Sequence, residues 1–305
     1  MRRTLIIPAA GKSSRYPNMK PKWLLTHPDG KLMIDKIITE NYYDNYDNII
    51  ISILQEHIDI YDASTILDQV FNSKKVTINV IDKPTKSAGE TVYKTILAQN
   101  ITGPVTIKDS DNIVTYTQPA SNNFIVGLDI EKNSITKPES KSFILKTEDD
   151  LIEDIIEKKI VSKNICVGVY SVDSAERFNE TYERIISSPL MVSESEIYVS
   201  HILSMYINTY GHHFDYVECN KFIDWSTIDE WKLEQERHAT YFVDIDGVLV
   251  DNVGKYGAKN WSNSNNIIIS NIECLKRLYD RGGQIILTTS RPAEYTDIII
   301  AILSQ

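Results

Sequence analysis

Short runs of β-branched and other apolar residues alternate along this chain with longer segments of mixed polarity. The runs with the length of strands are 4–9, 48–54, 76–81, 104–109, 124–130, 165–172, 241–246 and 284–290. The intervening segments with helical patterns are 32–43, 89–99, 173–187, 195–210 and 271–282. Strands that alternate with helices predict an α/β fold with a mixed, mostly parallel sheet. Because such sheets carry their sites at the carboxyl ends of the strands, we expect the functional residues in those loops.

The chain has 305 residues, which is long enough for two domains. A polar helical segment, 229–238, joins the first part of the chain to a new apolar strand at Tyr241. We therefore predict a boundary near residue 238, with one domain at 1–238 and another at 239–305.

Charge and composition exclude several classes of partner. The chain has 32 Lys and Arg against 42 Asp and Glu, a net charge of −10, which disfavours nucleic acid and anionic membranes as partners. The three cysteines are far apart and form neither a disulfide framework nor a zinc motif. No apolar run approaches the roughly 18 residues that a membrane span needs. We expect a cytoplasmic protein, and a homo-oligomer is compatible with the sequence.

The first predicted strand runs into a loop of small and cationic residues, "AAGKSSR" (9–15). Backbone amides of such a loop can approach a polyphosphate closely, while Arg15 and, further on, Lys22 neutralise its charge. Taken alone, the loop also fits an ordinary strand-to-helix turn with cations facing solvent.

Carboxylates follow two other apolar runs. Asp109 and Asp111 end the strand in "IKDSDN", and Asp224 follows a run in "FIDWST". Carboxylate oxygens at these positions can hold a hard divalent cation. The alternative is that each acidic group is simply solvated.

Two further motifs are ambiguous in isolation. Gly89 opens a predicted helix, where backbone can approach a base or phosphate, although an ordinary capping turn has the same sequence. Glu157 and Lys158 precede a strand that contains Gly168, and a solvated charge run would look alike.

In this order the motifs resemble those of the sugar-phosphate nucleotidyltransferase family, over residues 4 to about 235. The family's glycine-rich G-x-G-x-R loop and following lysine correspond to Gly11 to Arg15 and Lys22. Ser13 stands where the family has its second glycine, and serine still allows close approach of the backbone. The resemblance implies a Rossmann-like domain that transfers NMP from an NTP, CTP or UTP being favoured, to a phosphorylated sugar or alcohol.

The resemblance also implies roles for individual residues. Those implied to bind the nucleotide are Ala10, Gly11, Lys12, Ser13, Ser14, Gly89 and Asp111. Those implied to act in catalysis are Arg15, Lys22 and Lys158. Those implied to bind the acceptor are Glu157, Lys158 and Gly168. Mg²⁺ is implied at Asp111 and Asp224, with Asp109 as the substitute ligand.

No protein nucleophile is required, because the acceptor phosphate attacks the α-phosphorus and pyrophosphate leaves. The products implied are precursors of surface or capsular polysaccharide. Two alternatives stay open: a nucleotide-sugar-dependent glycosyltransferase, which needs no grip on pyrophosphate, and a non-catalytic nucleotide-binding scaffold.

The C-terminal part contains a second motif, "YFVDIDG" (241–247), which resembles the first motif of haloacid dehalogenase-like phosphatases. By that resemblance Asp244 is the nucleophile, Asp246 the general acid/base and Thr289 a phosphoryl-binding residue. After Arg291 no lysine or arginine follows, and Asp297 is the only aspartate. We therefore expect a partial HAD-like α/β domain, shortened or a remnant, whose phosphatase activity is doubtful.

Overall fold

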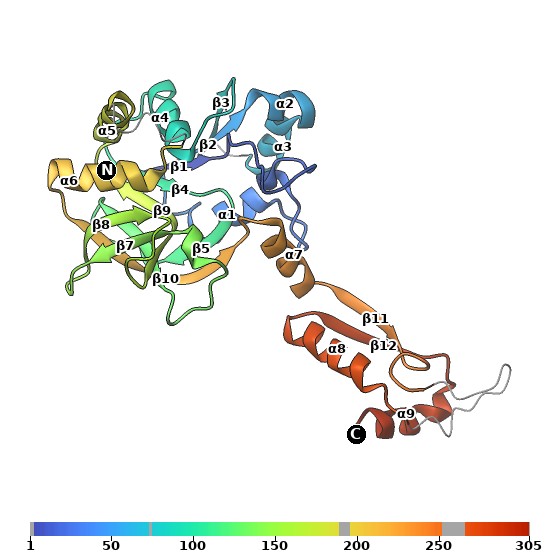
Figure 1. Cartoon of the computed structure of the whole chain (residues 1–305). Helices are drawn as coiled ribbons and strands as arrows, with labels where there is room; N and C mark the ends of the chain where they lie inside the picture. Colours follow the sequence, from blue (N-terminus) through green and yellow to red (C-terminus); the bar gives the residue numbers. More distant parts are fainter. Residues whose placement is uncertain (1–2, 73–74, 189–195, 252–265, 305) are drawn as a thin grey trace. The chain divides into compact units, whose positions relative to one another are not determined.

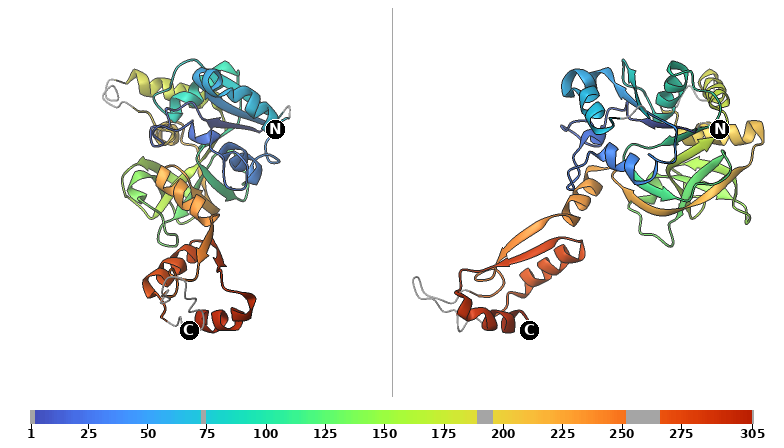
Figure 2. Two further views of the ribbon diagram at one scale, coloured as in Figure 1. Left: turned by 90° about the vertical axis from the view of Figure 1, so that its right-hand side faces the viewer. Right: turned by 180° about the vertical axis from the view of Figure 1, so that it is seen from behind.

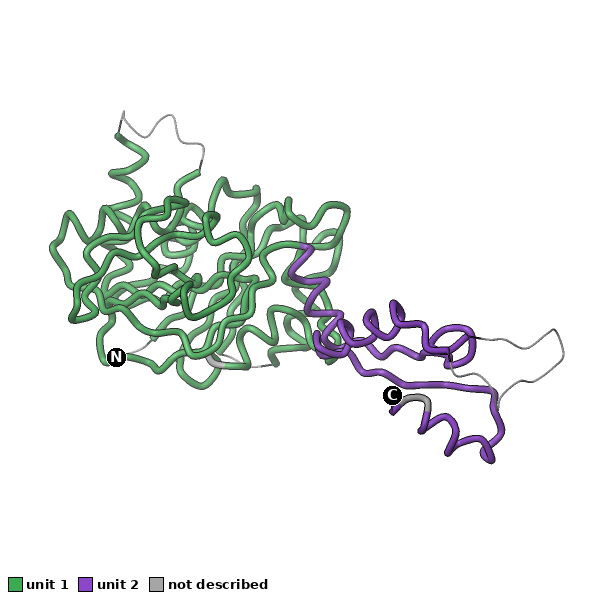
Figure 3. The backbone as a smooth tube through the Cα atoms, turned by 60° about the horizontal axis from the view of Figure 1, so that its bottom comes forward, with its two compact units in different colours: residues 1–227 green, residues 228–305 purple. Residues whose placement is uncertain are grey.

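The computed structural model describes residues 3–72, 75–188, 196–251 and 266–304. The chain forms two compact units, residues 1–227 and 228–305 (Figure 3). The boundary predicted near residue 238 falls at the end of helix α7 (Ile228–Arg237), and the structure groups that helix with the second unit.

A mixed sheet of ten strands forms the centre of the first unit (Figure 1). Its strands are β1 (Thr4–Pro8), β2 (Asn48–Leu54), β3 (Val76–Ile81), β4 (Val105–Lys108), β5 (Asn112–Tyr116), β6 (Phe124–Asp129), β7 (Ser142–Lys146), β8 (Leu151–Glu157), β9 (Asn164–Val172) and β10 (Phe214–Asp224). Their order is β3-β2-β1-β4-β9-β6-β10-β8-β7, and β5 pairs with β10. From the pairings, β5, β8 and β9 run opposite to the other strands. The predicted mixed, mostly parallel α/β sheet is therefore confirmed.

Helices cover both faces of this sheet (Figures 1 and 2). They are α1 (Met33–Asn41), α2 (Gln55–Tyr61), α3 (Ala63–Val70), α4 (Ala88–Ala98), α5 (Ala175–Ser187) and α6 (Val199–Tyr210), with short 3₁₀ turns η1 (Lys22–Leu24) and η2 (Pro138–Ser140). Successive residues of a strand point to opposite faces. Leu5 and Ile7 accordingly pack into a core with α1 and α3, whereas Ile6 packs into a second core with α4, α5 and α6. Burial on both faces explains why the parallel strands have nearly continuous apolar sequences.

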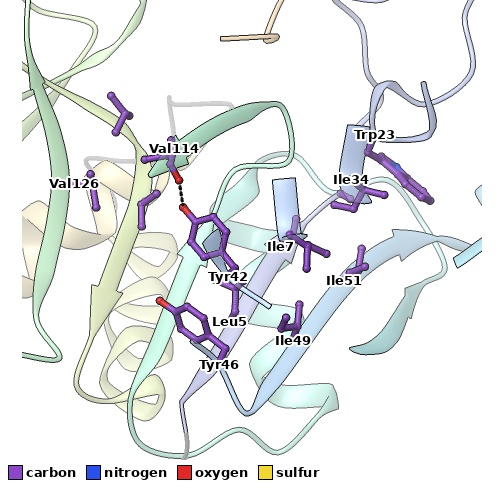
Figure 4. Packing of buried hydrophobic residues seen from close by; sticks show 14 of the residues in the cluster. Leu5, Ile7, Trp23, Ile34, Tyr42, Tyr46, Ile49, Ile51, Val114 and Val126 are labelled. Atoms are coloured by element: carbon purple, nitrogen blue, oxygen red, sulfur yellow. Dashed lines mark hydrogen bonds between the residues drawn. The ribbon is translucent and has the colours of Figure 1, made fainter. Parts of the chain in front are cut away.

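The first core also holds strand β5 in place (Figure 4). Tyr42, at the end of α1, donates a hydrogen bond from its hydroxyl to the backbone oxygen of Val114 in β5, at 3.2 Å. Tyr46 and Tyr116 share a second buried hydrogen bond between their hydroxyls, at 3.1 Å. These contacts fix β5, the strand that begins immediately after the "KDSD" segment.

All the strands and helices predicted from the sequence are present within a few residues of the expected bounds, apart from residue 195, which lies outside the described residues. Strands β5, β7, β8 and β10 were not predicted. Strand β10 carries polar side chains and an irregular register near Cys219, and β8 has charged residues on its exposed face, so neither has an apolar run.

The second unit contains α7, β11 (Thr240–Asp244), α8 (Ile269–Asp280), β12 (Gln284–Thr288), η3 (Ala293–Tyr295) and α9 (Thr296–Leu303). β11 and β12 pair in parallel, with Asp244 opposite Thr288. A small hydrophobic cluster in this unit contains the buried residues Ile245, Leu249 and Val250. Within the described parts of both units, no helix combines the length and apolarity that crossing a membrane would require.

Candidate active site

A cavity of about 170 Å³ lies at the carboxyl ends of the strands of the first unit, where a site was expected. It is lined by side chains from distant parts of the sequence, among them Arg15, Asp109, Asp111, Lys141, Ser142, Glu157, Gly168 and Tyr198. Five of the residues predicted from the sequence therefore border one cavity: Arg15, Asp109, Asp111, Glu157 and Gly168.

The pairing of β5 with β10 brings the two predicted metal-binding aspartates together. Asp224, the last residue of β10, lies opposite Asn112, the first residue of β5. One step further on, the backbone N–H of Trp225 donates to the carbonyl oxygen of Asp111 at 2.9 Å. The backbones of Asp111 and Asp224 are therefore neighbours where the antiparallel pair ends, and a metal ion shared by their carboxylates stays a prediction.

Each of these carboxylates forms an ion pair with a lysine. Lys22 Nζ forms an ion pair with Asp111 Oδ2, and Lys141 Nζ forms one with Asp224 Oδ2. Burial alone would raise the pKa of Asp111, but the charge and hydrogen bond of Lys22, assisted by Lys141, lower it below its ordinary value. Asp111 is thus ionised at neutral pH and available as a ligand.

A third lysine, Lys108, lies beneath the same carboxylates and is fully buried. Its Nζ donates to the carbonyl oxygen of Asp109 at 2.7 Å, to the carbonyl oxygen of Asn112 at 2.9 Å and to Asn112 Oδ1. All three ammonium protons are used. Burial lowers the pKa of Lys108 to about 8, against the opposing charges of Asp109 and Asp111. The ammonium closes the "DSDN" segment into a tight loop.

Lys108 was not predicted as a site residue. The available signal was its position: a lysine ends the apolar strand "VTIK", all of whose residues are buried. An ionisable group at a buried strand position requires polar partners close by.

Asp109 occupies space that only a glycine leaves open. Its backbone N–H donates to the carbonyl oxygen of Gly168 at 2.9 Å. Gly168 has φ +80°, and a Cβ there would lie 2.3 Å from Asp109 Oδ2. Gly168 therefore makes room for the Asp109 carboxylate; its predicted contact with the acceptor stays a prediction. Burial, together with the neighbouring charge of Asp111, raises the pKa of Asp109.

On the other side of the cavity, Glu157 ends β8. Its Oε2 accepts hydrogen bonds from the hydroxyls of Ser142 in β7 and Ser200 in α6, the latter at 2.5 Å. The exposed Lys158 donates to the hydroxyl of Tyr198, and its Nζ lies 4.1 Å from the centre of that ring. Ser142, Ser200 and Tyr198 were not predicted, because their segments carry no motif and become neighbours only through the fold.

The predicted phosphate loop has an exposed edge and a buried root. Ala10 is buried against Leu54 and Ile81, so only its backbone is available to a ligand. Gly11, Lys12, Ser14 and Arg15 are exposed. A Cβ built on Gly11 would meet no atom within 4 Å, which leaves the backbone open to approach.

Gly89 serves packing. It is the second residue of α4, and a Cβ there would lie 2.6 Å from the carbonyl oxygen of Ile197. The missing side chain lets α4 approach the segment before α6. The neighbouring Ala88 lines the cavity, which leaves the nucleotide-binding role of this helix start as a prediction.

Ser13, the residue that departs from the family pattern, adopts the left-handed conformation with φ +49°. Its carbonyl oxygen accepts from Tyr16 N at 2.8 Å. The hydroxyl of Tyr16 then donates to the carbonyl oxygens of Trp225 and Thr227. The turn at Ser13 thereby ties the phosphate loop to the segment that follows Asp224.

In the second unit, the predicted residues gather at one end of the β11–β12 pair. Arg291, whose side chain is fully buried, donates from Nε to both Asp246 oxygens at 3.0 Å and also from Nη2. Thr289 Oγ1 donates to Asp246 Oδ2 at 3.1 Å. The Arg291 hydrogen bonds lower the pKa of Asp246. Asp244 is exposed and accepts from Ile245 N.

The first unit's fold is shared with solved structures. The chain is similar to a nucleoside-diphosphate-sugar pyrophosphorylase from Vibrio cholerae RC9 at 18% identity and a TM-score of 0.64, over 76% of this chain and 99% of that one. It is similar to the inositol-1-phosphate CTP transferase from T. maritima at 13% identity and a TM-score of 0.58, over 75% of this chain and 91% of that one. It is also similar to a UDP-glucose pyrophosphorylase complexed with UDP-glucose at 15% identity and a TM-score of 0.59, over 77% of this chain and 97% of that one.

No family model and no curated protein matches the sequence. At these identities the likeness to the solved structures establishes a common fold.

Ser13 gives a direct test of the loop conformation. Replacing it with glycine removes a left-handed strain of about 1–2 kcal/mol and adds about 0.5–1 kcal/mol of unfolded-state entropy, so Ser13→Gly should stabilise the protein by about 0.5–1 kcal/mol. The neighbouring Ser14 has no positive φ, so Ser14→Gly should destabilise it by a similar amount. Urea unfolding followed by tryptophan fluorescence measures both; equal losses in the two variants would contradict the left-handed turn.

Proposed function

We propose that the first unit transfers a nucleotidyl group from an NTP to a phosphorylated sugar or alcohol and releases pyrophosphate. The observation that carries this proposal is one cavity lined by Arg15 of the phosphate loop, by Asp109 and Asp111, and by Glu157, with Asp224 paired to the strand that begins next to Asp111. The common fold with nucleotidyltransferases of known structure supports it.

In this reaction a phosphate oxygen of the acceptor forms a bond to the α-phosphorus. The bond from the α-phosphorus to the bridging oxygen of the β-phosphate breaks, and pyrophosphate departs with that electron pair. The protein has to hold two anions in line and offset their charge, which is work for positioned cations and not for a nucleophile. Arg15 borders the cavity and Lys22 reaches Asp111 at its edge, so both are suited to the triphosphate.

The residues present fit a divalent cation. Asp111 and Asp224 are adjacent, each already carries a cationic group, and Asp109 lies beside Asp111 as a third carboxylate. Mg²⁺ would be held by Asp111 and Asp224 and would supply charge neutralisation to the phosphates when bound. Asp109 is the alternative ligand.

The acceptor side is built around Glu157. With two serine hydroxyls donating to it, this carboxylate is held in one orientation at the cavity wall, suited to accept hydrogen bonds from hydroxyls of a sugar or polyol. Lys158 and Tyr198 next to it suit the acceptor phosphate and its carbon skeleton.

We favour CTP or UTP as the donor and the synthesis of surface or capsular polysaccharide precursors in the cytoplasm as the role. The support is the family resemblance of the "AAGKSSR" and "KPKWLL" segments, together with neighbours whose names include CTP and UDP.

Pyrophosphate release tests the proposal. The protein is incubated with Mg²⁺, each of the four NTPs and a panel of sugar and polyol phosphates. Release that requires both an NTP and an acceptor phosphate is expected. Transfer from an NDP-sugar without pyrophosphate would identify a glycosyltransferase. Nucleotide binding without any turnover would identify a scaffold.

Removal of either loop cation should lower turnover. Arg15→Ala and Lys22→Ala are each expected to reduce kcat/KM by roughly 10²-fold, because each loses a charge interaction with the transferring phosphates. Lys20→Ala, an exposed cation on the same loop, is the matched control and should leave kcat/KM unchanged. Near-normal kcat/KM in Arg15→Ala or Lys22→Ala would remove that residue from the phosphate site.

We propose that the second unit is HAD-like and has no useful phosphatase activity. Arg291 is engaged with Asp246, and the lowered pKa of Asp246 keeps it ionised at neutral pH, so it is a poor proton donor. A panel of sugar and polyol phosphates should therefore give no phosphate release. Release that disappears in Asp244→Asn would prove a complete site.

A further inference from the structure

Each of the two candidate metal carboxylates forms an ion pair with a lysine, and both ion pairs are partly exposed. The side chains of Lys22 and Asp111 are 21% and 11% exposed, and those of Lys141 and Asp224 are 17% and 11% exposed. Water and ligands reach all four. Lys108 differs, since it is fully buried and donates to carbonyl and amide oxygens and to no carboxylate.

The charges in this cluster balance. Asp109, Asp111 and Asp224 supply three carboxylates, and Lys22, Lys108 and Lys141 supply three ammonium groups. A divalent cation has a charge of +2, which equals the combined charge of the Lys22 and Lys141 ammonium groups. Its entry with departure of Lys22 and Lys141 is therefore charge-neutral at the carboxylates, whereas its entry beside them would add two positive charges in one place.

The two lysines belong to opposite sides of the cavity. The backbone N–H of Lys22 donates to Ser13 Oγ at 3.4 Å, which links it to the phosphate loop. The carbonyl oxygen of Lys141 accepts from Lys158 N at 3.1 Å, which links it to the acceptor segment. These backbone contacts place Lys22 beside the phosphate loop and Lys141 beside the acceptor segment.

We propose that Asp111 and Asp224 store Lys22 and Lys141 until a divalent cation replaces them, and that Lys141 is then a further phosphate-binding residue of the active site. This inference rests on the proposed function. It assigns to Lys141 a role that the sequence motifs did not indicate. It also makes cation binding the step that frees both ammonium groups to bind a triphosphate.

The exchange predicts opposite effects of one substitution on two ligands. Lys141→Gln removes a competitor for Asp224, so the Kd for Mn²⁺ in the absence of nucleotide should fall about fivefold, the factor expected for one partly exposed ion pair. The same variant should bind the α,β-methylene analogue of CTP or UTP, in saturating Mn²⁺, at least about fivefold more weakly. Electron paramagnetic resonance of free Mn²⁺ and calorimetry measure the two constants.

Lys146 offers a matched control. Lys141 pairs with Asp224, and its Nζ lies 5.7 Å from the centre of the Phe222 ring. Lys146 likewise pairs with an aspartate, Asp150, and its Nζ lies 4.8 Å from the centre of the Tyr216 ring. Lys146→Gln should change neither constant. Lys141→Arg keeps the cation and should return both constants towards those of the unmodified protein.

Unchanged or weaker Mn²⁺ binding in Lys141→Gln would overturn the exchange. Tighter Mn²⁺ binding with unaltered analogue binding would overturn the phosphate-binding role of Lys141. The Mn²⁺ measurement needs no turnover, so a protein that showed the Mn²⁺ effect but released no pyrophosphate would contradict the proposed function and leave the exchange standing.

Discussion

The candidate site depends on one buried cation. The Lys108 ammonium donates its three hydrogen bonds to oxygens of Asp109 and Asn112, the two ends of a four-residue segment. These bonds determine where β4 ends and β5 begins. A buried ammonium without such partners would be costly, because burial removes its hydration. The chain therefore has a strong reason to keep this loop in one conformation, with Asp109 and Asp111 on its cavity side.

From that loop the rest of the site follows by strand pairing. Because β5 starts at Asn112, its antiparallel pairing with β10 places Asp224 opposite Asn112, the residue that follows Asp111. Because Gly168 in β9 has no side chain, the Asp109 carboxylate can occupy the space next to the Gly168 backbone. Tyr16 then ties the phosphate loop to the segment beyond Asp224. Cations and carboxylates that are far apart in the sequence become neighbours through backbone geometry.

Sequence reasoning located the parts of this site that follow apolar strands. The parallel strands β1 to β4 have nearly continuous apolar runs, so the loops after β1 and β4, with Arg15, Asp109 and Asp111, could be predicted from the sequence. The rest could not be read, because it depends on tertiary contacts. Lys141 lies between η2 and β7, Ser142 begins β7 and Ser200 lies in α6, and none of these segments carries a motif. The left-handed conformation of Ser13 is a property of the turn, and no residue type specifies it.

The central claim is that Asp111 and Asp224 form one cation site that Lys108 organises. It is tested most directly by anomalous diffraction at the manganese edge, from crystals grown with Mn²⁺ and a non-hydrolysable CTP or UTP analogue. A single strong peak between the Asp111 and Asp224 carboxylates, with Lys108 still bonded to Asn112, is the predicted result. A peak away from both carboxylates, or the two carboxylates too far apart to share one ion, would contradict it.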